Sequence, residues 1–318
     1  PNTTARAWAA RKKHSYDLVV MGVPGSTTGG AAGVYAFATD FDLTVEALES
    51  YYAMLEPGGF LVISLWTDTP PKGSLRLFAT MHAALEQSGV TQPEKQLAWV
   101  RSWNTATLLV KQGELGNEEI SAIRDFSESR NFDLAWLPGL GEHDVNRYQL
   151  LPKPFFYMAA RAILSGQGAG FMGNYQYDIE PVRDVNPYFD DHFRWRSLSA
   201  FLALPGGSGI AMIGAGYPTL IATLLQAILA AVVLILAPLL FLRRKLHTDG
   251  RLRSRVVIYF SVIGLAFLFI ELSFIEMLTL VIGQPLYAVA VTLGVFLVFS
   301  GLGSLTVQWF MERKGLEP

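Results

Sequence analysis

The sequence predicts an α/β region followed by an all-helical membrane region. Strand-like and helix-like segments alternate in the first third of the chain. The last third is almost free of charge, since residues 197–242 hold no Lys, Arg, Asp or Glu, and between Arg255 and Glu312 only Glu271 and Glu276 are charged. Charged residues make up 16% of the chain, against about 25% in soluble domains. The composition therefore excludes a wholly soluble protein, and the ample apolar content excludes a disordered one.

The α/β prediction rests on the order of elements along the first third. Hydrophobic periodicity and turn residues predict, in chain order, a strand at 16–21 (YDLVVM), an amphipathic helix at 39–56, a turn at Glu56–Gly59 (EPGG), a strand at Phe60–Trp66, a helix at 74–88 and a strand at Thr105–Gly113. Strand, helix and strand at this spacing are typical of an α/β layer with a mostly parallel sheet. We divide the chain into this α/β region (1–115), a small α/β or linking region (116–196) and the membrane region (197–318).

Three apolar runs predict membrane-spanning helices at 219–242, 256–282 and 286–307. Each has the length of about 20 residues that crosses a hydrocarbon core, and backbone groups in lipid require helical hydrogen bonds. The basic loop from Arg243 to Arg255 belongs on the cytoplasmic side, and the short turn Gly283–Pro285 makes the last two spans a hairpin. We expect a multi-pass protein of the cell membrane, of the bacterial inner membrane type.

Two carboxyl groups, Glu271 and Glu276, fall inside the second span. They are five residues apart, about 140° around a helix, so they do not share one narrow face. A carboxyl group in lipid costs a few kcal/mol, which makes these residues candidates for a proton or cation site. The alternative is a hydrogen-bonded or protonated pair that pins helices together, and no basic residue lies in any span to pair with them.

Several function classes are excluded by composition. The chain has no Cys, so disulfides, thiol catalysis and Cys-ligated metal sites are absent. Residues 1–196 have a net charge of −5 and residues 197–318 of +3, neither of which is the basic excess of a nucleic-acid-binding protein. The run Asp190, Asp191 and His192, with Asp184 upstream, offers metal-ligand types. A salt-bridge cluster with Arg183, Arg194 and Arg196 is the favoured interpretation, and we predict no metal site.

An ordered set of motifs resembles a known family. YDLVV, a helix and LEPGGFLVIS are similar to the fourth and fifth strands of class I S-adenosylmethionine-dependent methyltransferases. The whole chain resembles the membrane-bound spermidine synthase-like proteins, which join such a domain to hydrophobic helices. The resemblance continues in FDLAWLPGL (Phe132–Leu140), NRYQLLPKPFFYMAARAIL (Asn146–Leu164), YDIEPVRDVNPYFDDHFRW (Tyr177–Trp195) and IELSFIEMLTLVIGQPLYAVAV (Ile270–Val291).

The resemblance implies a partial Rossmann-like, methyltransferase-type domain and a transferase whose cofactor is S-adenosylmethionine or its decarboxylated form. The glycine-rich loop and acidic ribose ligand of that family would precede Pro1, so we expect a fragment that binds no cofactor by itself. In aminopropyltransferases two Asp residues follow the fourth strand, but Gly22 and Gly25 occupy those positions here. The absence of both carboxylates argues against polyamine chemistry. Beside the lipid bilayer, the expected partner is a small-molecule amine or a nucleoside-type ligand.

The loop after the first strand is the remaining candidate site. Gly22, Pro24, Gly25 and Ser26 would lie on the rim of a ligand site, because ligands of open α/β sheets bind at the carboxyl ends of strands. A flexible turn is the alternative. If the α/β region is catalytically inactive, the second functional hypothesis is a non-enzymatic membrane binding or transport module that uses Glu271 and Glu276.

Overall fold

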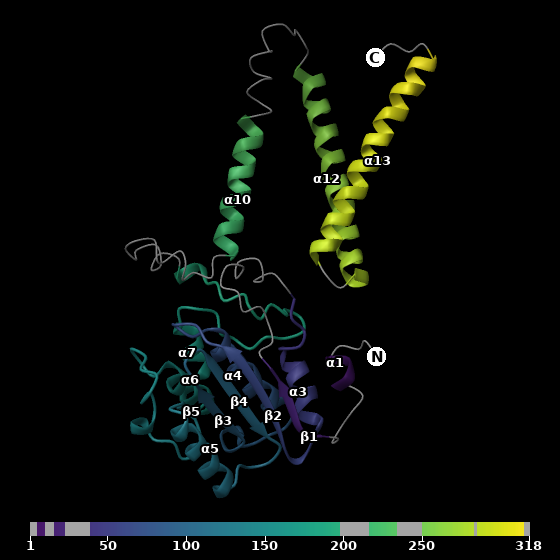
Figure 1. Cartoon of the computed structure of the whole chain (residues 1–318). Coiled ribbons are helices and arrows are strands. Elements are labelled where there is room, and N and C mark those ends of the chain that lie inside the picture. The colour runs from purple at the N-terminus through teal and green to yellow at the C-terminus, as the bar shows by residue number, and fades with distance from the viewer. Residues whose placement is uncertain are drawn as a thin grey trace. The chain divides into compact units, whose positions relative to one another are not determined.

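The computed structural model describes residues 5–9, 16–22, 39–197, 216–233, 250–282 and 285–314. The chain divides into two compact units, Pro1–Ala230 and Ala231–Pro318. The first unit contains a five-stranded sheet with helices on both faces, and the second contains two long helices (Figure 1).

The sheet has the strand order β1-β2-β4-β3-β5. Its strands are β1 (Tyr16–Met21), β2 (Leu55–Trp66), β3 (Leu97–Arg101), β4 (Thr105–Lys111) and β5 (Asp133–Trp136). β1 and β2 are parallel, with Val20 opposite Val62, but the β2–β4, β3–β4 and β3–β5 pairs are all antiparallel. The prediction of a mostly parallel sheet is therefore wrong: the sheet is mixed, because the short turn Ser102–Thr105 makes β3 and β4 a hairpin.

The helix between β1 and β2 begins later than its periodicity predicts. The sequence predicts a helix over 39–56, whereas α3 covers Val45–Ala53. The Thr44 hydroxyl accepts a hydrogen bond from the Ala47 amide at 3.2 Å and so caps the helix. Upstream, the Asp42 amide donates to the Asp40 carboxylate at 2.9 Å, which forms a turn in place of a helical one.

The EPGG segment lies inside β2 and does not precede it as a separate turn. Tyr16 pairs with Leu55 and Leu18 with Phe60, so the extra residues of β2 are accommodated by a shift in register. Gly58 has φ +87°, a conformation that glycine adopts freely. A Cβ on Gly59 would lie 2.9 Å from the Tyr16 carbonyl oxygen. Both glycines of the motif therefore have a structural reason.

The region 116–196 completes the same sheet and core. Helices α5 (Asn117–Ser129), α6 (Phe155–Leu164) and α7 (Gly168–Asn174) belong to it, together with β5. The sequence analysis did not predict β3 or β5. β3 is buried at all five positions, so its pattern lacks the alternation that marks a half-buried strand.

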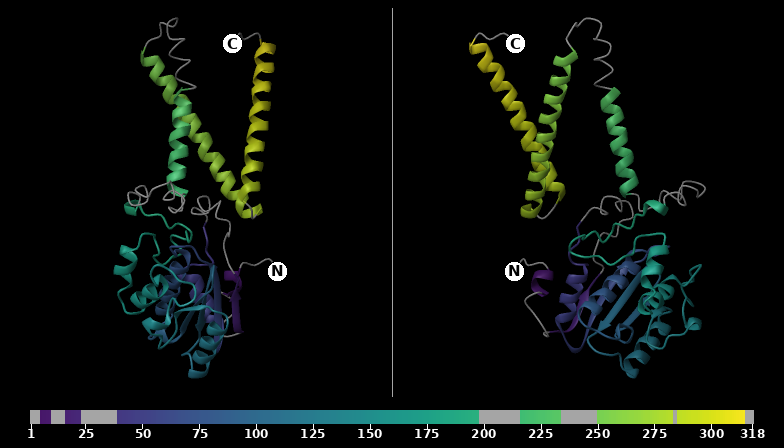
Figure 2. Two further views of the ribbon diagram at one scale, coloured as in Figure 1. Left: turned by 60° about the vertical axis from the view of Figure 1, so that its left-hand side comes forward. Right: turned by 180° about the vertical axis from the view of Figure 1, so that it is seen from behind.

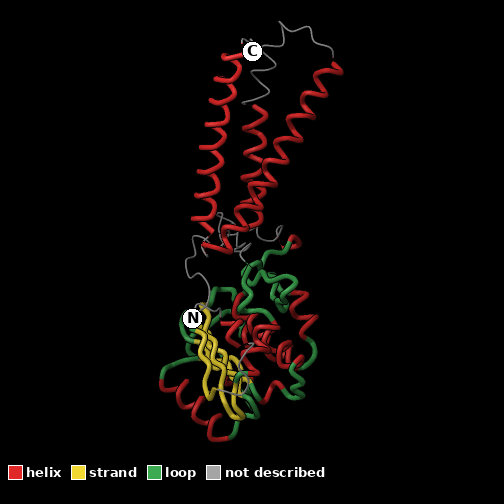
Figure 3. The backbone as a smooth tube through the Cα atoms, turned by 90° about the vertical axis from the view of Figure 1, so that its right-hand side faces the viewer, coloured by secondary structure: helices red, strands yellow, loops and turns green. Residues whose placement is uncertain are grey.

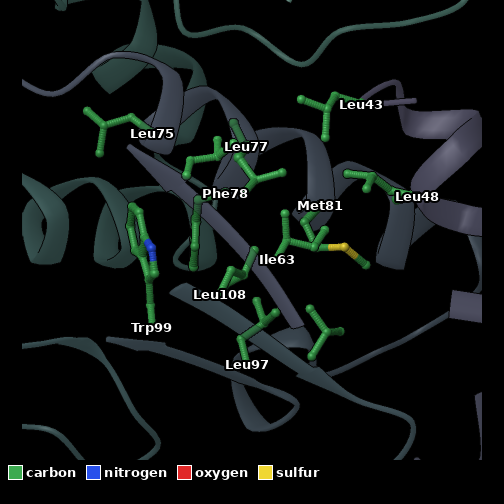
Figure 4. Packing of buried hydrophobic residues seen from close by; sticks show 14 of the residues in the cluster. Leu43, Leu48, Ile63, Leu75, Leu77, Phe78, Met81, Leu97, Trp99 and Leu108 are labelled. Carbon is green, nitrogen blue, oxygen red and sulfur yellow. The ribbon is translucent and has the colours of Figure 1, made fainter. Parts of the chain in front are cut away.

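The core of the first unit lies on both faces of the sheet. Helices α3, α4 (Gly73–Gln87) and α6 cover one face, where Ile63, Leu108 and Trp99 pack against Phe78 (Figure 4). The Phe78 and Trp99 rings stack with centroids 4.7 Å apart. Helix α5 covers the other face over β3 and β5, through Ile120 and Ile123. Each fully buried side chain of this size contributes about 1.5–3 kcal/mol.

The C-terminal helices are apolar on most of their surface. α12 (Gly250–Ile282) and α13 (Pro285–Lys314) contain the segments Ile258–Thr279 and Leu286–Thr306, which are long and apolar enough to cross a membrane. They are coloured light green and yellow in Figure 2. The first predicted span, 219–242, is described only to residue 233, and its described part is the shorter apolar helix α10 (Gly216–Ala231). Figure 3 shows these helices in red and the sheet in yellow.

The contact between α12 and α13 combines an aromatic cluster with two small residues. The Phe296 ring of α13 lies 5.2 Å from the Phe267 ring and 5.8 Å from the Phe274 ring of α12, between ring centroids. Ala288 and Thr292 of α13 are buried, and the Thr292 hydroxyl has no hydrogen-bond partner among the described residues.

Candidate functional site

The carboxyl ends of β1 and β2 define one edge of the sheet, here called the carboxyl edge. Gly22 follows β1, and Thr67 and Asp68 follow Trp66 at the end of β2. Arg101, at the end of β3, lies at the same edge because β3 runs in the same direction as β2. Ligands of open α/β sheets bind beyond such an edge, which makes it the candidate functional site.

Residues 175–192 cross the carboxyl edge at the start of α4. The Tyr175 hydroxyl donates to the Pro71 carbonyl oxygen at 2.7 Å. The buried Arg76 guanidinium donates to the carbonyl oxygens of Tyr188 (3.0 Å) and Phe189 (2.8 Å) and pairs with the Asp178 carboxylate at 2.9 Å. Burial lowers the pKa of Arg76, and Asp178 opposes that shift. Arg76 therefore fastens this segment to α4.

Three carboxyl groups from separate segments approach one another at the carboxyl edge. The Asp40 amide donates to the Pro187 carbonyl oxygen at 2.7 Å, which brings Asp40 toward Asp190. Burial raises the pKa of Asp190, and the charges of Asp40 and Asp68 raise it further while Arg76 and Lys72 oppose them. Burial likewise raises the pKa of Asp40. The raised pKa values allow Asp40 and Asp190 to exchange a proton closer to neutral pH than an exposed Asp does.

The Lys72 ammonium group and the Tyr177 ring lie beside these carboxyl groups. The Lys72 ammonium lies 3.5 Å from the Asp68 carboxylate and 5.7 Å from the centre of the Tyr177 ring. Burial raises the pKa of the Tyr177 hydroxyl to about 12, so that it stays protonated. Aromatic faces and carboxylates both attract cationic groups, and Lys72 is such a group in contact with both. The edge is chemically suited to an amine.

The sequence analysis found only part of this set. Gly22 lies at the edge, with no atom within 4 Å of a Cβ placed on it, whereas Pro24, Gly25 and Ser26 fall outside the described residues. Asp190 was noted from the sequence only as part of the Asp190–His192 run of metal-ligand residue types. Asp40, Asp68 and Lys72 were not predicted. The position of Asp68, two residues after a predicted strand, was the available signal.

The described side chains around the Asp190–His192 run do not form a cluster of metal ligands. Among the described residues no group of three or more His, Asp or Glu could hold a metal ion. His192 is buried, its ring Nδ1 lies 2.9 Å from the Asp178 carbonyl oxygen, and burial holds its pKa well below the usual value, with Arg76 adding to the effect. A neutral ring at this position is structural.

Within residues 39–197, which the structure describes, the arginines of the predicted salt-bridge cluster do not pair with Asp184, Asp190 or Asp191. The Asp184 carboxylate binds Arg6 and accepts a hydrogen bond from Thr44 at 2.8 Å. The arginines bind elsewhere: Arg194 pairs with Asp178 and Glu180, Arg183 with Glu46, and Arg196 donates to the carbonyl oxygens of Gly173 and Tyr175. Long-range contacts, which a linear sequence does not reveal, decide these pairings.

A second buried ion pair, Arg101–Asp133, joins β3 to β5. The Asp133 carboxylate lies 2.6 Å from the Arg101 guanidinium and accepts the backbone amides of Arg147, Tyr148 and Gln149 at 2.6–2.9 Å. All its strong acceptor positions are engaged, so it holds the 146–151 loop in place and is not available for proton transfer.

The two candidate carboxyl groups of α12, Glu271 and Glu276, have different surroundings. Glu271 is half-buried on the face of α12 that contacts α13, whereas Glu276 is exposed. The hydroxyl groups of Ser273 and Thr279 donate to the backbone carbonyl oxygens of Phe269 and Ile275, at 2.8 and 2.7 Å. Glu271 is therefore the better candidate for a role in the hairpin.

No protein-family model matches the sequence, and no curated protein matches it.

Proposed function

We propose that the chain is part of a membrane-held transferase of the spermidine synthase-like or methyltransferase-like type, whose ligands bind at the carboxyl edge. The strand order supports this proposal. Two parallel strands, β1 and β2, are followed across the sheet by the antiparallel β4 and then by β3. This arrangement resembles the end of the class I methyltransferase sheet, where an antiparallel last strand lies between the fifth and sixth strands.

The exposed side of β1 supports a larger sheet. β1 is the end strand, and its side chains Leu18 and Val20 are 56% and 61% exposed. Among the described strands, β1 has an unpaired edge. A further strand would satisfy its backbone groups and widen the face on which Leu18 and Val20 lie, so that a helix packed on that face would cover them. We propose that upstream strands of the whole protein pair here and supply the binding site for S-adenosylmethionine or its decarboxylated form.

The acceptor in this proposal is a cationic amine. Asp40, Asp68 and Asp190 surround the edge with negative charge, and Tyr177 offers an aromatic face. Gly22 and Gly25 stand where aminopropyltransferases have Asp, so any base for the amine must come from other residues. Burial raises the pKa of Asp40, Asp190 and Asp191, and of these we propose Asp190, on which the charges of Lys72 and Asp68 act, as the base.

The test is binding of radiolabelled S-adenosylmethionine and its decarboxylated form to the full-length protein in membranes. We expect saturable binding, and crosslinked peptides that include residues next to Gly22 or Asp68. Asp68→Asn and Asp190→Asn are expected to weaken a co-bound amine and to leave cofactor binding intact, with Glu114→Gln at the opposite edge as the matched control. The absence of binding at millimolar concentrations of either cofactor contradicts the proposal.

We further propose that α12 and α13 cross a bilayer as a hairpin, which makes this a multi-pass membrane protein. Support comes from their spans of 22 and 21 residues, with mean hydropathies of 2.2 and 2.1 and few buried side chains. Apolar surface of this extent requires lipid or another protein to cover it.

The second candidate function is a membrane binding or transport module that depends on Glu271. It is favoured by the half-buried position of Glu271 and by the buried, unbonded hydroxyl of Thr292 on the facing helix. In this case Glu271→Gln abolishes function and the exposed Glu276→Gln does not, whereas Asp68→Asn and Asp190→Asn have no effect. Normal function of Glu271→Gln removes this candidate.

A further inference from the structure

Large apolar side chains are exposed along the carboxyl edge of the first unit. The group, here called the edge apolar surface, consists of Trp66, Trp103, Leu150, Val185, Tyr188 and Trp195. Trp103 is 83% exposed and Val185 92%. A single exposed apolar residue needs no explanation, but a group drawn from five separate segments does.

Each member is held at this edge by contacts of its neighbours. Trp66 ends β2, and Trp103 lies in the β3–β4 turn, where the Thr67 amide donates to the Asn104 carbonyl oxygen at 2.7 Å. Leu150 follows the loop that Asp133 and Arg101 hold. Tyr188 and Val185 belong to the segment that Arg76 fastens over α4.

Trp195 follows the same segment toward the membrane region. The next two residues are anchored, since the Arg196 guanidinium donates to the Tyr175 carbonyl oxygen at 3.1 Å and the Ser197 hydroxyl to the Gln176 carbonyl oxygen at 2.7 Å. Residues 175 and 176 lie beside Pro71, after β2. The edge apolar surface thus ends where the uncharged sequence 197–242 begins.

The opposite edge of the sheet has a different character. It is formed by Glu56–Gly59, Gln87–Gln92 and Lys111–Gly116, all of which the structure describes, and none of these three segments exposes a large hydrophobic side chain. These segments consist mainly of Gly, Gln and Glu. Apolar exposure is therefore biased toward the carboxyl edge and does not reflect a generally apolar surface.

We propose that the edge apolar surface docks on the interfacial region of a lipid bilayer. The proposal rests on the proposed membrane hairpin, which keeps a bilayer tethered to this unit. Three of the six residues are Trp and one is Tyr, the residue types that gather at lipid–water interfaces. Residues 1–196 carry a net charge of −5, so attraction to anionic lipid does not drive the docking and apolar insertion does. A ligand of the carboxyl edge then arrives from the lipid–water interface.

The test uses the absence of Cys in the natural chain. The full chain is reconstituted in phosphatidylcholine vesicles with one environment-sensitive fluorophore, attached at Asn104→Cys, Val185→Cys, Thr91→Cys or Val262→Cys. We then measure how strongly nitroxide-labelled lipids quench the fluorophore. One set of lipids has the nitroxide near the headgroup, and the other has it deeper in the acyl chain. Asn104 and Val185 report the edge apolar surface, exposed Thr91 reports the opposite edge, and Val262 reports insertion of α12.

We expect quenching at 104, 185 and 262 and none at 91. Quenching at 262 alone overturns the docking and leaves the hairpin standing. No quenching at any position contradicts the hairpin and the docking together, and equal quenching at 91 and 104 overturns the specificity of the edge.

A pair of variants tests the role of the aromatic side chain. Trp103→Asp is expected to reduce quenching at 185 several-fold, whereas Trp103→Phe keeps it. High salt, or the addition of anionic lipid to the phosphatidylcholine vesicles, is expected to leave the quenching unchanged. Unchanged quenching in Trp103→Asp, or quenching that appears only after anionic lipid is added, overturns the proposal.

Discussion

The two units of this chain differ in where their large apolar side chains lie. In the α/β unit the interior is apolar, with Leu61, Ile63 and Phe78 fully buried. In the helical unit Phe260 and Phe269 are each 65% exposed, and among the residues whose burial is described only Ala288 and Thr292 are buried. The apolar interior of the α/β unit suits water, whereas the exposed apolar surface of α12 and α13 needs lipid or another protein to cover it.

The largest effect is expected for the ion pair inside the α/β unit. Asp133→Ala leaves the buried Arg101 guanidinium uncompensated and frees three backbone amides, and we expect a loss of about 3–5 kcal/mol in the free energy of unfolding. Urea denaturation of the full chain in micelles measures it. The control Glu128→Ala removes the half-exposed partner of Arg147 and is expected to cost less than about 1 kcal/mol. Equal losses of unfolding free energy in the two variants would show that the Arg101–Asp133 pair stabilises the fold no more than an exposed ion pair does.

Two leucine substitutions, one in the α/β core and one on the exposed face of α12, compare a side chain packed against protein with one that we expect to face lipid. Leu108→Ala opens a cavity in the core and is expected to cost about 2–5 kcal/mol. Leu268→Ala, on the outward face of α12, is expected to cost less than about 1 kcal/mol in a bilayer, because lipid replaces the lost contacts. Thermal or denaturant unfolding in vesicles measures both. A large loss for Leu268→Ala would mean that protein, not lipid, covers that face.

A moderate, pH-dependent effect is expected at His192. Its pKa in the folded state is lowered by burial, so neutral His192 contributes stability that is fully present above the ordinary pKa of 6.5 and is lost as the pH falls toward the folded-state pKa. His192→Asn retains an amide donor for the Asp178 carbonyl oxygen and is expected to lose less stability than the natural chain between pH 7.5 and about 5. Urea titrations at both values measure this. The exposed His143→Asn serves as control, and an identical pH dependence in His192→Asn and the natural chain contradicts a buried neutral ring.

The smallest effect is expected in the contact between α12 and α13. Thr292→Val replaces a hydroxyl that has no partner among the described residues with a methyl group of similar size. We expect a change within about 0.5 kcal/mol in hairpin stability, measured by unfolding in mixed micelles. A loss above about 1 kcal/mol would show that the hydroxyl is bonded, with Glu271 as the first residue to examine.

The sequence analysis predicted the local elements better than their pairing. The runs YDLVVM and FLVISLW correspond to β1 and to most of β2, because alternating or continuous apolar residues have few other local solutions. The antiparallel pairing of β3 with β4 and β5 was missed, since β3 is short and buried on both faces and resembles no half-buried strand.

The site was less accessible to sequence reasoning than the fold. Gly22 indicated the carboxyl edge through its place after a strand, but the carboxyl groups of Asp40, Asp68 and Asp190 come from segments far apart in the chain. Their approach depends on long-range contacts such as the hydrogen bond from the Asp40 amide to Pro187 and the contacts of Arg76. No local pattern encodes such contacts.

We propose that one polypeptide joins an α/β unit that folds in water to a helical unit that lies in lipid. Washing membranes that contain the expressed full chain with alkaline carbonate tests this most directly. We expect the protein to stay in the membrane pellet and to be released only by detergent. Recovery of a stable, monodisperse protein in plain buffer without detergent would contradict it.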